Sequence, residues 1–500
     1  MAGDEEERAR MKIKIAVISD IHLSSGAALG RRGDIAEILL TRTVHRLNRY
    51  IRPDVTLVPG DVIDDASSPD ALQHLQRVRA VLDLLNSPSI VIPGNHDGAL
   101  ERFYRHFEKP LEHVDINGFR FVWFADCDEP DFNARRSDAD LARMNRIRAG
   151  HEGPIIALQH VPVLPPGTAS CPYGYTNAEA VLDAMNRNGI GLAISGHFHT
   201  GLDPVRVNGV QVTAAPALSE SPFSFLEIDI DGGSLHVRRH HLRMPDNLGL
   251  IDCHVHTQFA YCRENTSMPR AMALAKDFGL AACIFTEHSG QLYLNQETYW
   301  RGEFLKEGLE YGQGRDNRMD QYFAAAAEAG CPAGCVGLEA DCDFRGRPML
   351  RNQERSRAAF VLGAVHVLPE LQKPEPSPAR VADEFMAQLE QFVKGGIDSL
   401  AHPFRVFQRH RIEVPPWIFA PVVKLLKLHN VAAEVSFHCN DPSPEFFRLC
   451  IDAGVKLTFG SDTHNLYQVG EFTPHLDLLR GAGFDGNPRD VLLQPKGPLV

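Results

Sequence analysis

Eleven of the 23 histidines fall into two series of motifs that combine histidine with carboxylate or amide residues, five in the first series and six in the second. The first series consists of Asp20, His22, Asp61, Asn95, His96, Asp97, His160, His197 and His199. The second consists of His254, His256, His288, Glu339, His366, His402, Asp462 and His464. Imidazole, carboxylate and amide donors together favour manganese, iron or zinc. The two series therefore predict two separate metal centres with hydrolytic chemistry.

The ligands of both series stand where short hydrophobic runs end, which predicts strands that position them. In the first series these runs are 12–19, 54–60, 89–94, 154–159 and 192–196. Residues i and i+2 of a strand project to the same face, so Asp20 and His22 can bind one ion, and His254 and His256 another. The glycines before Asp61, Asn95 and His197 allow tight turns at the ends of the strands.

The first series closely resembles the calcineurin-like metallophosphoesterases over roughly residues 12–243. The resemblance implies two ions bridged by Asp61 and a hydroxide that attacks phosphorus. It assigns one ion to Asp20, His22, Asp61 and His199, and the other to Asp61, Asn95, His160 and His197. It also implies that His96 stabilises the transition state or protonates the leaving oxygen, with Asp97 orienting it.

The second series resembles the PHP (polymerase and histidinol phosphatase) family over roughly residues 250–495. The resemblance implies a distorted seven-stranded (β/α) barrel that usually holds three ions. It assigns the first ion to His254, His256, Glu339 and Asp462, and the second to Glu339, His366 and His402. His288 and His464 would hold the third ion, and we expect Glu264 to complete this set. Arg405 is a candidate for phosphate binding or an ordinary ion-paired arginine, and His438 a candidate proton donor or a loop histidine without a role.

The length of 500 residues favours more than one domain. We predict a first domain at 11–243, a linker at 244–250 that contains Pro and Gly, and a second domain at 251–500. For the first domain the resemblance implies a four-layer α/β/β/α sandwich, and its last part, with a turn at 231–233, predicts a β-hairpin. In the second domain seven expected strands alternate with helical patterns, which indicates a (β/α) barrel. They lie at 250–253, 282–286, 334–338, 359–365, 397–400, 431–436 and 455–459. We expect 291–317 to be a loop that contacts substrate.

The composition narrows the range of partners. The formal net charge of -13 disfavours nonspecific binding to nucleic acid or anionic lipid. We find no signal peptide and no apolar stretch long enough for a membrane span, so we predict a cytoplasmic protein without a membrane partner. Ten cysteines without regular pairing do not indicate a disulfide framework. A small phosphorylated molecule is the expected substrate.

These observations favour a bifunctional metal-dependent phosphoesterase of the α/β class. The first domain would cleave small phosphodiesters, in the manner of cyclic-nucleotide enzymes, and the second would cleave phosphomonoesters. We expect two Mn, Fe or Zn ions in the first domain and up to three in the second. One alternative is a repair or proofreading nuclease, against which the negative charge and the aromatic content of 8% count. The other is a binding scaffold stabilised by metals, in which His96 and Asp97 would have no function.

Overall fold

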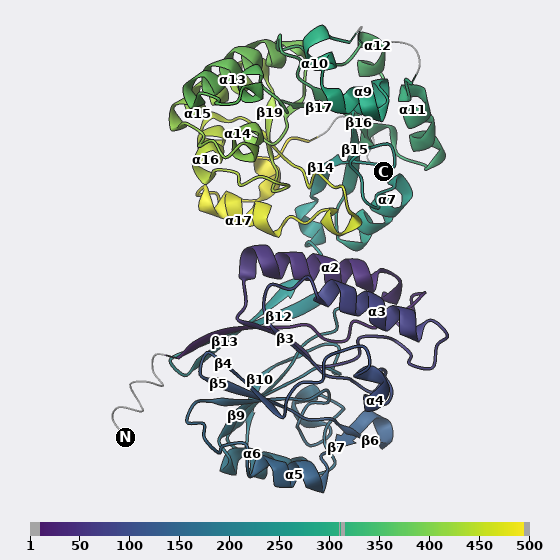
Figure 1. Ribbon diagram of the computed structural model, residues 1–500, viewed down its shortest axis with the longest axis vertical. Coiled ribbons are helices and arrows are strands. Elements are labelled where there is room, and N and C mark those ends of the chain that lie inside the picture. The colour runs from purple at the N-terminus through teal and green to yellow at the C-terminus, as the bar shows by residue number, and fades with distance from the viewer. Residues whose placement is uncertain (1–10, 310, 312–315, 495–500) are drawn as a thin grey trace. The chain divides into compact units, whose positions relative to one another are not determined.

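The computed structural model describes residues 11–309, 311 and 316–494, which form two compact units (Figure 1). The division between the units falls between Arg243 and Met244. The backbone N–H of Met244 donates to the carbonyl of Phe278, so the start of the predicted linker is bound to the second unit. The linker also contains a short 3-10 helix, Asp246–Leu248. The domain limits 11–243 and 251–500 remain a prediction.

The first unit contains two mixed sheets packed face to face. The order in the five-stranded sheet is β13 (Ser234–His241), β12 (Ser224–Asp231), β1 (Lys12–Val17), β2 (Val55–Val58) and β3 (Ser89–Val91). The order in the six-stranded sheet is β10 (Leu202–Val207), β11 (Val210–Ala214), β9 (Ile190–Ser195), β8 (Ile155–Leu158), β5 (Phe119–Trp123) and β4 (His113–Ile116). β1, β2 and β3 are parallel, as are β5, β8 and β9, and these strands lead into the candidate ligands.

Helices cover the outer faces of both sheets, as Figure 1 shows. On the five-stranded sheet they are α2 (Ala36–Arg46) and α3 (Ala71–Leu82), and on the six-stranded sheet α5 (Asp138–Met144) and α6 (Ala178–Arg187). Phe121 belongs to the core between the sheets, whereas its neighbour Val122 belongs to the core that includes Leu182 of α6. This alternation is the period of a strand buried on both faces. The predicted α/β/β/α sandwich is confirmed.

Seven parallel strands in chain order form the sheet of the second unit. They are β14 (Ile251–Val255), β15 (Ala282–His288), β16 (Val336–Asp341), β17 (Phe360–Ala364), β18 (Ser399–Leu400), β19 (Ala432–Val435) and β20 (Leu457–Phe459). Thr463, just beyond β20, donates to the carbonyl of His254 and accepts from the N–H of His256, which closes the sheet at its carboxyl end. The predicted (β/α) barrel is therefore confirmed, and its ring is completed by a loop residue.

The barrel helices are short, and all but the last of those given below, which follows β20, connect successive strands. They include α7 (Met268–Asp277), α11 (Met319–Glu328), α13 (Pro378–Phe392), α15 (Phe419–His429), α16 (Pro444–Ala453) and α17 (Thr473–Gly481). α13 is the longest described helix of the chain, with 15 residues. None of the helices in the described part of the chain is long and apolar enough to span a bilayer.

The prediction of a loop at 291–317 is wrong for about half of its length. The segment contains α9 (Gln296–Arg301), α10 (Phe304–Glu307) and the last residues of α8 (Ser289–Tyr293), while residues 310 and 312–315 lie outside the described part. Asn295 caps α9 by accepting a hydrogen bond from the N–H of Thr298, and Phe304 and Leu305 are buried. Capping and two buried side chains stabilise helices that are too short to show a clear period in the sequence.

Candidate metal centres

The first centre lies where strands of both sheets of the first unit end. Asp20 and His22 follow β1, Asp61 follows β2 and Asn95 follows β3, while His160 follows β8 and both His197 and His199 follow β9. Asp20, His22, Asp61 and His197 have φ angles of 53°, 47°, 54° and 63°. This left-handed region is unfavourable for residues with a side chain, and such strain is concentrated at functional sites. The turns thus point four candidate ligands inward at a conformational cost.

Four of these side chains converge as the first set. Nε2 of His22 lies 3.8 Å from Oδ1 of Asp20, 3.7 Å from Oδ2 of Asp61 and 3.3 Å from Nε2 of His199. The carboxylate of Asp20 also accepts a hydrogen bond of 3.0 Å from the backbone N–H of His197. The structure therefore brings together all four residues that we predicted for the first ion.

The second set shares Asp61 with the first. Nε2 of His160 lies 3.2 Å from Oδ2 of Asp61 and 3.0 Å from Oδ1 of Asn95. Nδ1 of His197 lies 3.2 Å from Nε2 of His160. Because Oδ2 of Asp61 faces both His22 and His160, its position suits a bridge between two ions.

Backbone carbonyls fix the rings of the second set. Nδ1 of His160 donates to the carbonyl of Pro59 at 2.7 Å, and Nε2 of His197 donates to the carbonyl of Phe132 at 2.9 Å. A carbonyl only accepts, so these nitrogens carry the protons and the opposite nitrogens present lone pairs to the centre. Metal-binding histidines are oriented in the same way.

Carboxylates hold the two rings of the first set. Nδ1 of His199 lies 2.7 Å from Oε1 of Glu220, and Nδ1 of His22 lies 3.2 Å from Oδ1 of Asp64. Asp64 in turn binds Nη2 of Arg31 at 2.9 Å. Sequence reasoning missed Asp64 and Glu220, although Asp64 lies three residues beyond the ligand Asp61. A carboxylate behind a ligand histidine orients the ring and strengthens its binding.

The electrostatics of the first centre suit cations. Burial would raise the pKa of Asp61, but the neighbouring histidines His160 and His22 lower it below its usual range. Burial would lower the pKa of His160, but the carboxylates of Asp61 and Asp20 raise it to about 10. In the absence of metal, a second proton on the ring of His160 thus offsets part of the charge of the buried carboxylates. Divalent ions would supply that positive charge and release the protons.

His96 lies beside both sets, but Asp97 does not have the role that we expected. Nδ1 of His96 donates to the carbonyl of Asp64 at 2.6 Å, which orients the ring. Asp97 instead accepts backbone hydrogen bonds from Val62, Ile63 and Gly94. Burial, aided by the charge of Asp61, raises the pKa of Asp97 to about 7. Asp97 therefore fixes the two loops that carry Asp61 and Asn95 rather than the imidazole of His96.

A cavity of about 270 Å³ opens onto the first centre. It is lined by Arg31, Asp61, Asn95, His96, Phe132, Pro172, Tyr173, His197, Phe198, His199 and Thr200. Its volume is close to the lower end of the usual range for small-molecule sites, about 300 Å³. The cavity suits a small substrate that reaches the ligands and His96 together.

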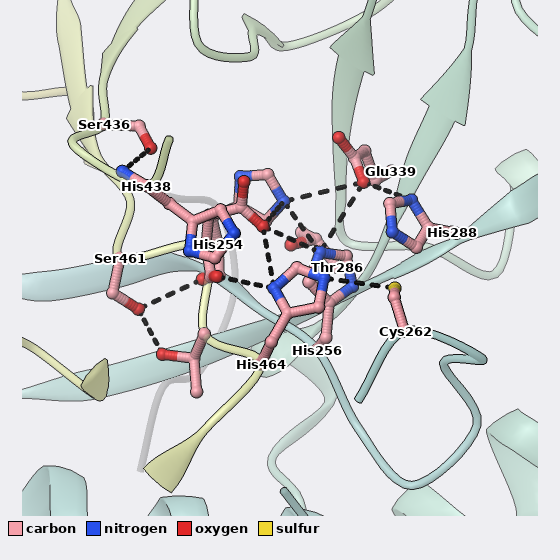
Figure 2. A network of polar contacts seen from close by, with 12 residues as sticks. His254, His256, Cys262, Thr286, His288, Glu339, Ser436, His438, Ser461 and His464 are labelled. Carbon is pink, nitrogen blue, oxygen red and sulfur yellow. Dashed lines mark hydrogen bonds and ion pairs between the residues drawn. The ribbon is translucent and has the colours of Figure 1, made fainter. Parts of the chain in front are cut away.

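The second centre lies at the carboxyl ends of the barrel strands (Figure 2). Nε2 of His254 and Nε2 of His256 are 3.2 Å apart. Oδ1 of Asp462 lies 3.4 Å from the first nitrogen and 3.1 Å from the second. Oε2 of Glu339 lies 3.6 and 3.7 Å from the same two atoms. The four residues predicted for the first ion of this centre therefore surround a common point.

Glu339 connects this set to the next one. Its other oxygen, Oε1, lies 3.3 Å from Nε2 of His366 and 3.2 Å from Nε2 of His402. Oε2 also lies 2.5 Å from Nδ1 of His288, and neither of these two buried atoms hydrogen-bonds to another described residue. Glu339 thus fits the bridging role that we predicted.

Buried carboxylates support three histidines of the second centre from behind. Nδ1 of His254 lies 2.8 Å from Glu434, Nδ1 of His256 lies 3.2 Å from Glu287, and Nδ1 of His366 lies 2.7 Å from Asp341. Sequence reasoning gave none of these carboxylates a role at the centre. Burial would lower the pKa of His254, but the carboxylates of Asp462, Glu434 and Glu339 raise it well above its usual value. The surplus of negative charge again suits bound cations.

The expected contribution of Glu264 to the third set is wrong. Glu264 is exposed, and its carboxylate accepts a hydrogen bond from the side chain of Asn465. The thiol of Cys262 lies instead 3.1 Å from Nε2 of His464 and interacts with His288. Burial would raise the pKa of this thiol, but hydrogen bonds with the two histidines lower it to about 5. The backbone turns between Cys262 and Glu264, so the thiol rather than the carboxylate faces the histidines.

The two candidate substrate residues contact the metal ligands. The guanidinium of Arg405 donates to Oδ2 of Asp462. Of the two roles considered for Arg405, phosphate binding and an ordinary ion pair, the structure shows the ion pair. The ring of His438 stacks on His464 with a centroid distance of 4.8 Å. Nδ1 of His438 accepts from Nε2 of Gln468 at 3.1 Å, which leaves Nε2 as the donor. Burial lowers the pKa of His438 to about 4, so its ring is neutral at pH 7.

Comparisons with known proteins identify both halves of the chain. Residues 13–201 match the calcineurin-like phosphoesterase family, and residues 252–436 match the PHP domain. A probable glycerophosphodiester phosphodiesterase, GpdQ, of Arcobacter nitrofigilis is 31% identical over 96 residues, which are 19% of this chain and 33% of that protein. The chain therefore spans about a third of the length of this relative.

Two solved structures align with part of the chain. A dimetal phosphatase from Danio rerio aligns with a TM-score of 0.40 and 17% identity, over 46% of this chain and 96% of its own. A purple acid phosphatase from yellow lupin (Lupinus luteus) seeds aligns with a TM-score of 0.35 and 14% identity, over 47% of this chain and 52% of its own.

Proposed function

Because the chain joins a calcineurin-like phosphoesterase domain to a PHP domain, we propose that it is a metal-dependent phosphoester hydrolase with two active sites. The first site cleaves small phosphodiesters, and the second cleaves phosphomonoesters. The observation that carries this proposal is that each unit brings candidate ligands together around one buried carboxylate, Asp61 in the first and Glu339 in the second. Two such centres in one chain favour two reactions over one.

The proposed cofactors are divalent Mn, Fe or Zn ions, two in the first site and up to three in the second. When bound, such ions polarise the phosphoryl group, neutralise developing charge and lower the pKa of water. In the first site Asp20, His22 and His199 would hold one ion and Asn95, His160 and His197 the other, with Asp61 between them. Nitrogen and oxygen donors of this kind fit all three metals.

In the first site His96 is the proposed proton donor to the leaving alkoxide. Its ring is fixed by the carbonyl of Asp64, and it lines the cavity together with Asn95 and Arg31. A diester leaves as an alkoxide, which needs a proton, so a histidine at this position contributes about 10²- to 10⁴-fold. The partial similarity to the probable glycerophosphodiester phosphodiesterase GpdQ supports a diester as the substrate class.

In the second site the proposed substrate is a terminal phosphate. A phosphomonoester carries about -1.5 to -2 charges at neutral pH, which a centre of up to three ions would offset. His438 presents Nε2–H as a donor next to His464 and would bind a phosphoryl or leaving oxygen. Arg405 remains a candidate for the same phosphate, provided that it exchanges its bond with Asp462.

Hydrolysis of bis-p-nitrophenyl phosphate and p-nitrophenyl phosphate with added manganese tests this division. We expect His96→Ala to lower diesterase activity by about 10²-fold or more and leave monoesterase activity unchanged. His254→Ala should have the opposite pattern, because it removes a ligand of the second centre only. His236→Ala and His410→Ala, at exposed positions of the respective units, serve as matched controls.

Three outcomes would contradict the proposal. Loss of both activities through one substitution would place the chemistry in a single domain. No turnover of either ester by fully metal-loaded protein would favour a binding scaffold. Degradation of single-stranded DNA at enzyme concentrations too low to cleave the small esters would favour a nuclease.

A further inference from the structure

Cys262 lies in the turn that follows His256 at the mouth of the second centre. Its thiol is 3.1 Å from Nε2 of His464, and Figure 2 shows the sulfur directed at the histidine cluster. Nε2 of Gln291 donates a hydrogen bond to the sulfur at 3.4 Å. Contacts from two other segments, those of Gln291 and His464, therefore hold this thiol among the candidate metal ligands.

The surrounding histidines form a site that needs a further ligand. Nitrogens of His256, His288 and His464 all lie within 4.8 Å of one another. Asp462 presents Oδ1 to His254 and His256 and Oδ2 to Arg405, so its carboxylate is engaged on the other side of the cluster. Because His256 belongs to the set of the first ion, only His288 and His464 remain for the third, and two neutral imidazoles alone hold a dication weakly. A thiolate at Cys262 would supply a negative charge at this end of the centre.

We propose that Cys262, His288 and His464 bind the third ion of the second centre through one thiolate and two imidazoles, and that this subsite selects zinc over manganese. Thiolate is a soft ligand that favours zinc, whereas manganese prefers oxygen ligands. On binding, a sulfur–metal bond forms and the thiol releases its proton to solvent. The inference rests on the proposed metal-dependent function of the PHP domain, but it concerns only how one ion is held.

Cobalt titration of the full-length, metal-depleted protein tests this ligand directly. Thiolate ligation of Co²⁺ produces a charge-transfer absorption in the near ultraviolet that nitrogen and oxygen ligands do not produce. We expect this absorption to appear in the native protein and to be absent from Cys262→Ser. Cys262→His should restore the third bound ion without the absorption, because imidazole replaces the thiolate as the ligand.

Two further variants serve as controls, one at another cysteine of the same unit and one at the carboxylate near Cys262. Cys331→Ser alters another half-buried cysteine of the same unit, whose sulfur contacts Met272, and should retain the absorption. Glu264→Gln should also retain it, since the carboxylate of Glu264 is turned toward Asn465. Persistence of the absorption in Cys262→Ser would overturn the proposal. So would loss of the third ion in Glu264→Gln but not in Cys262→Ser.

Metal selectivity gives a second readout. After dialysis against equal concentrations of zinc and manganese, we expect the native protein to hold one more equivalent of zinc than Cys262→Ser, as measured by mass spectrometry of the metals. Equal zinc contents would refute selection by the thiolate. If the protein shows the thiolate absorption but hydrolyses no ester, the proposed function is contradicted and this inference is not. If it hydrolyses esters but lacks the absorption, this inference is contradicted and the proposed function is not.

Discussion

Nδ1 of His254 lies 2.8 Å from Oε1 of Glu434, and both side chains are fully buried. The other oxygen of Glu434 accepts a hydrogen bond of 2.6 Å from the backbone N–H of His402. One carboxylate thus orients two ligands that we assign to different ions. Glu434 therefore positions candidate ligands of two sets in the second centre.

Glu434→Gln should weaken metal binding at the second centre. The amide is neutral and cannot accept hydrogen bonds from both His254 and His402 as a carboxylate does. Replacing such a partner usually lowers metal affinity by about 10- to 100-fold. Competition with a chelator measures this affinity, and Glu445→Gln on the surface of α16 is the matched control. Equal affinities of the two variants would show that Glu434 has no positioning role.

Gly94→Ala should disrupt the first centre although it replaces no candidate ligand. A Cβ atom at residue 94 would lie 2.3 Å from Oδ1 of Asp61 and 2.7 Å from Cε1 of His160. We expect loss of bound metal from the first unit and a destabilisation of about 1–3 kcal/mol. Gly191→Ala, where a Cβ atom would meet open space, should match the native protein. Metal content and the midpoint of thermal unfolding provide the measurements, and native values for Gly94→Ala would contradict the packing described here.

The pair formed by buried Glu227 and half-buried His240 should make the stability of the first unit depend on pH. Nε2 of His240 lies 2.6 Å from Oε2 of Glu227, and this hydrogen bond lowers the pKa of the carboxyl from its ordinary 4.5 to about 2. Because the folded pKa is the lower one, the pair stabilises the fold above pH 4.5. That stabilisation is lost as the pH falls toward 2.

Glu227→Gln isolates this effect. At pH 7 we expect it to destabilise the metal-free protein by about 1–2 kcal/mol, a value reduced for partial solvent screening. The difference between native protein and variant should shrink as the pH is lowered from 5 to 3, as followed by urea unfolding. A difference that stays constant or grows over this range would contradict the pKa shift.

The convergence of the candidate ligands could be predicted from the sequence because each stands in a local pattern at the end of a strand. Asp20 and His22 share a strand-end motif, and the order of strands in both families of fold brings such ends together. The supporting carboxylates could not be predicted in this way. Glu220 and Glu434 lie 21 and 180 residues from the histidines that they contact, so only the folded chain brings them close.

Loops and edge strands were the other source of error. No spacing rule distinguishes Cys262 from Glu264 in a turn, since the path of the backbone decides which side chain faces the centre. β4 and β5 were missed, although Asn117 and Gly118 between them are the residues of a two-residue hairpin. That signal was present in the sequence, but β4 alternates between exposed and half-buried residues and has no buried one, so its hydrophobic pattern is weak.

Metal counting in four proteins tests the central claim of two independent centres most directly. The native chain, Asp61→Asn, Glu339→Gln and the double variant are loaded with manganese and zinc, desalted and assayed by mass spectrometry of the metals. Distant, independent sites contribute additively. The two-centre account predicts that each single variant loses ions and that the double variant loses the sum of both. A double variant that loses no more ions than one of the single variants would contradict it.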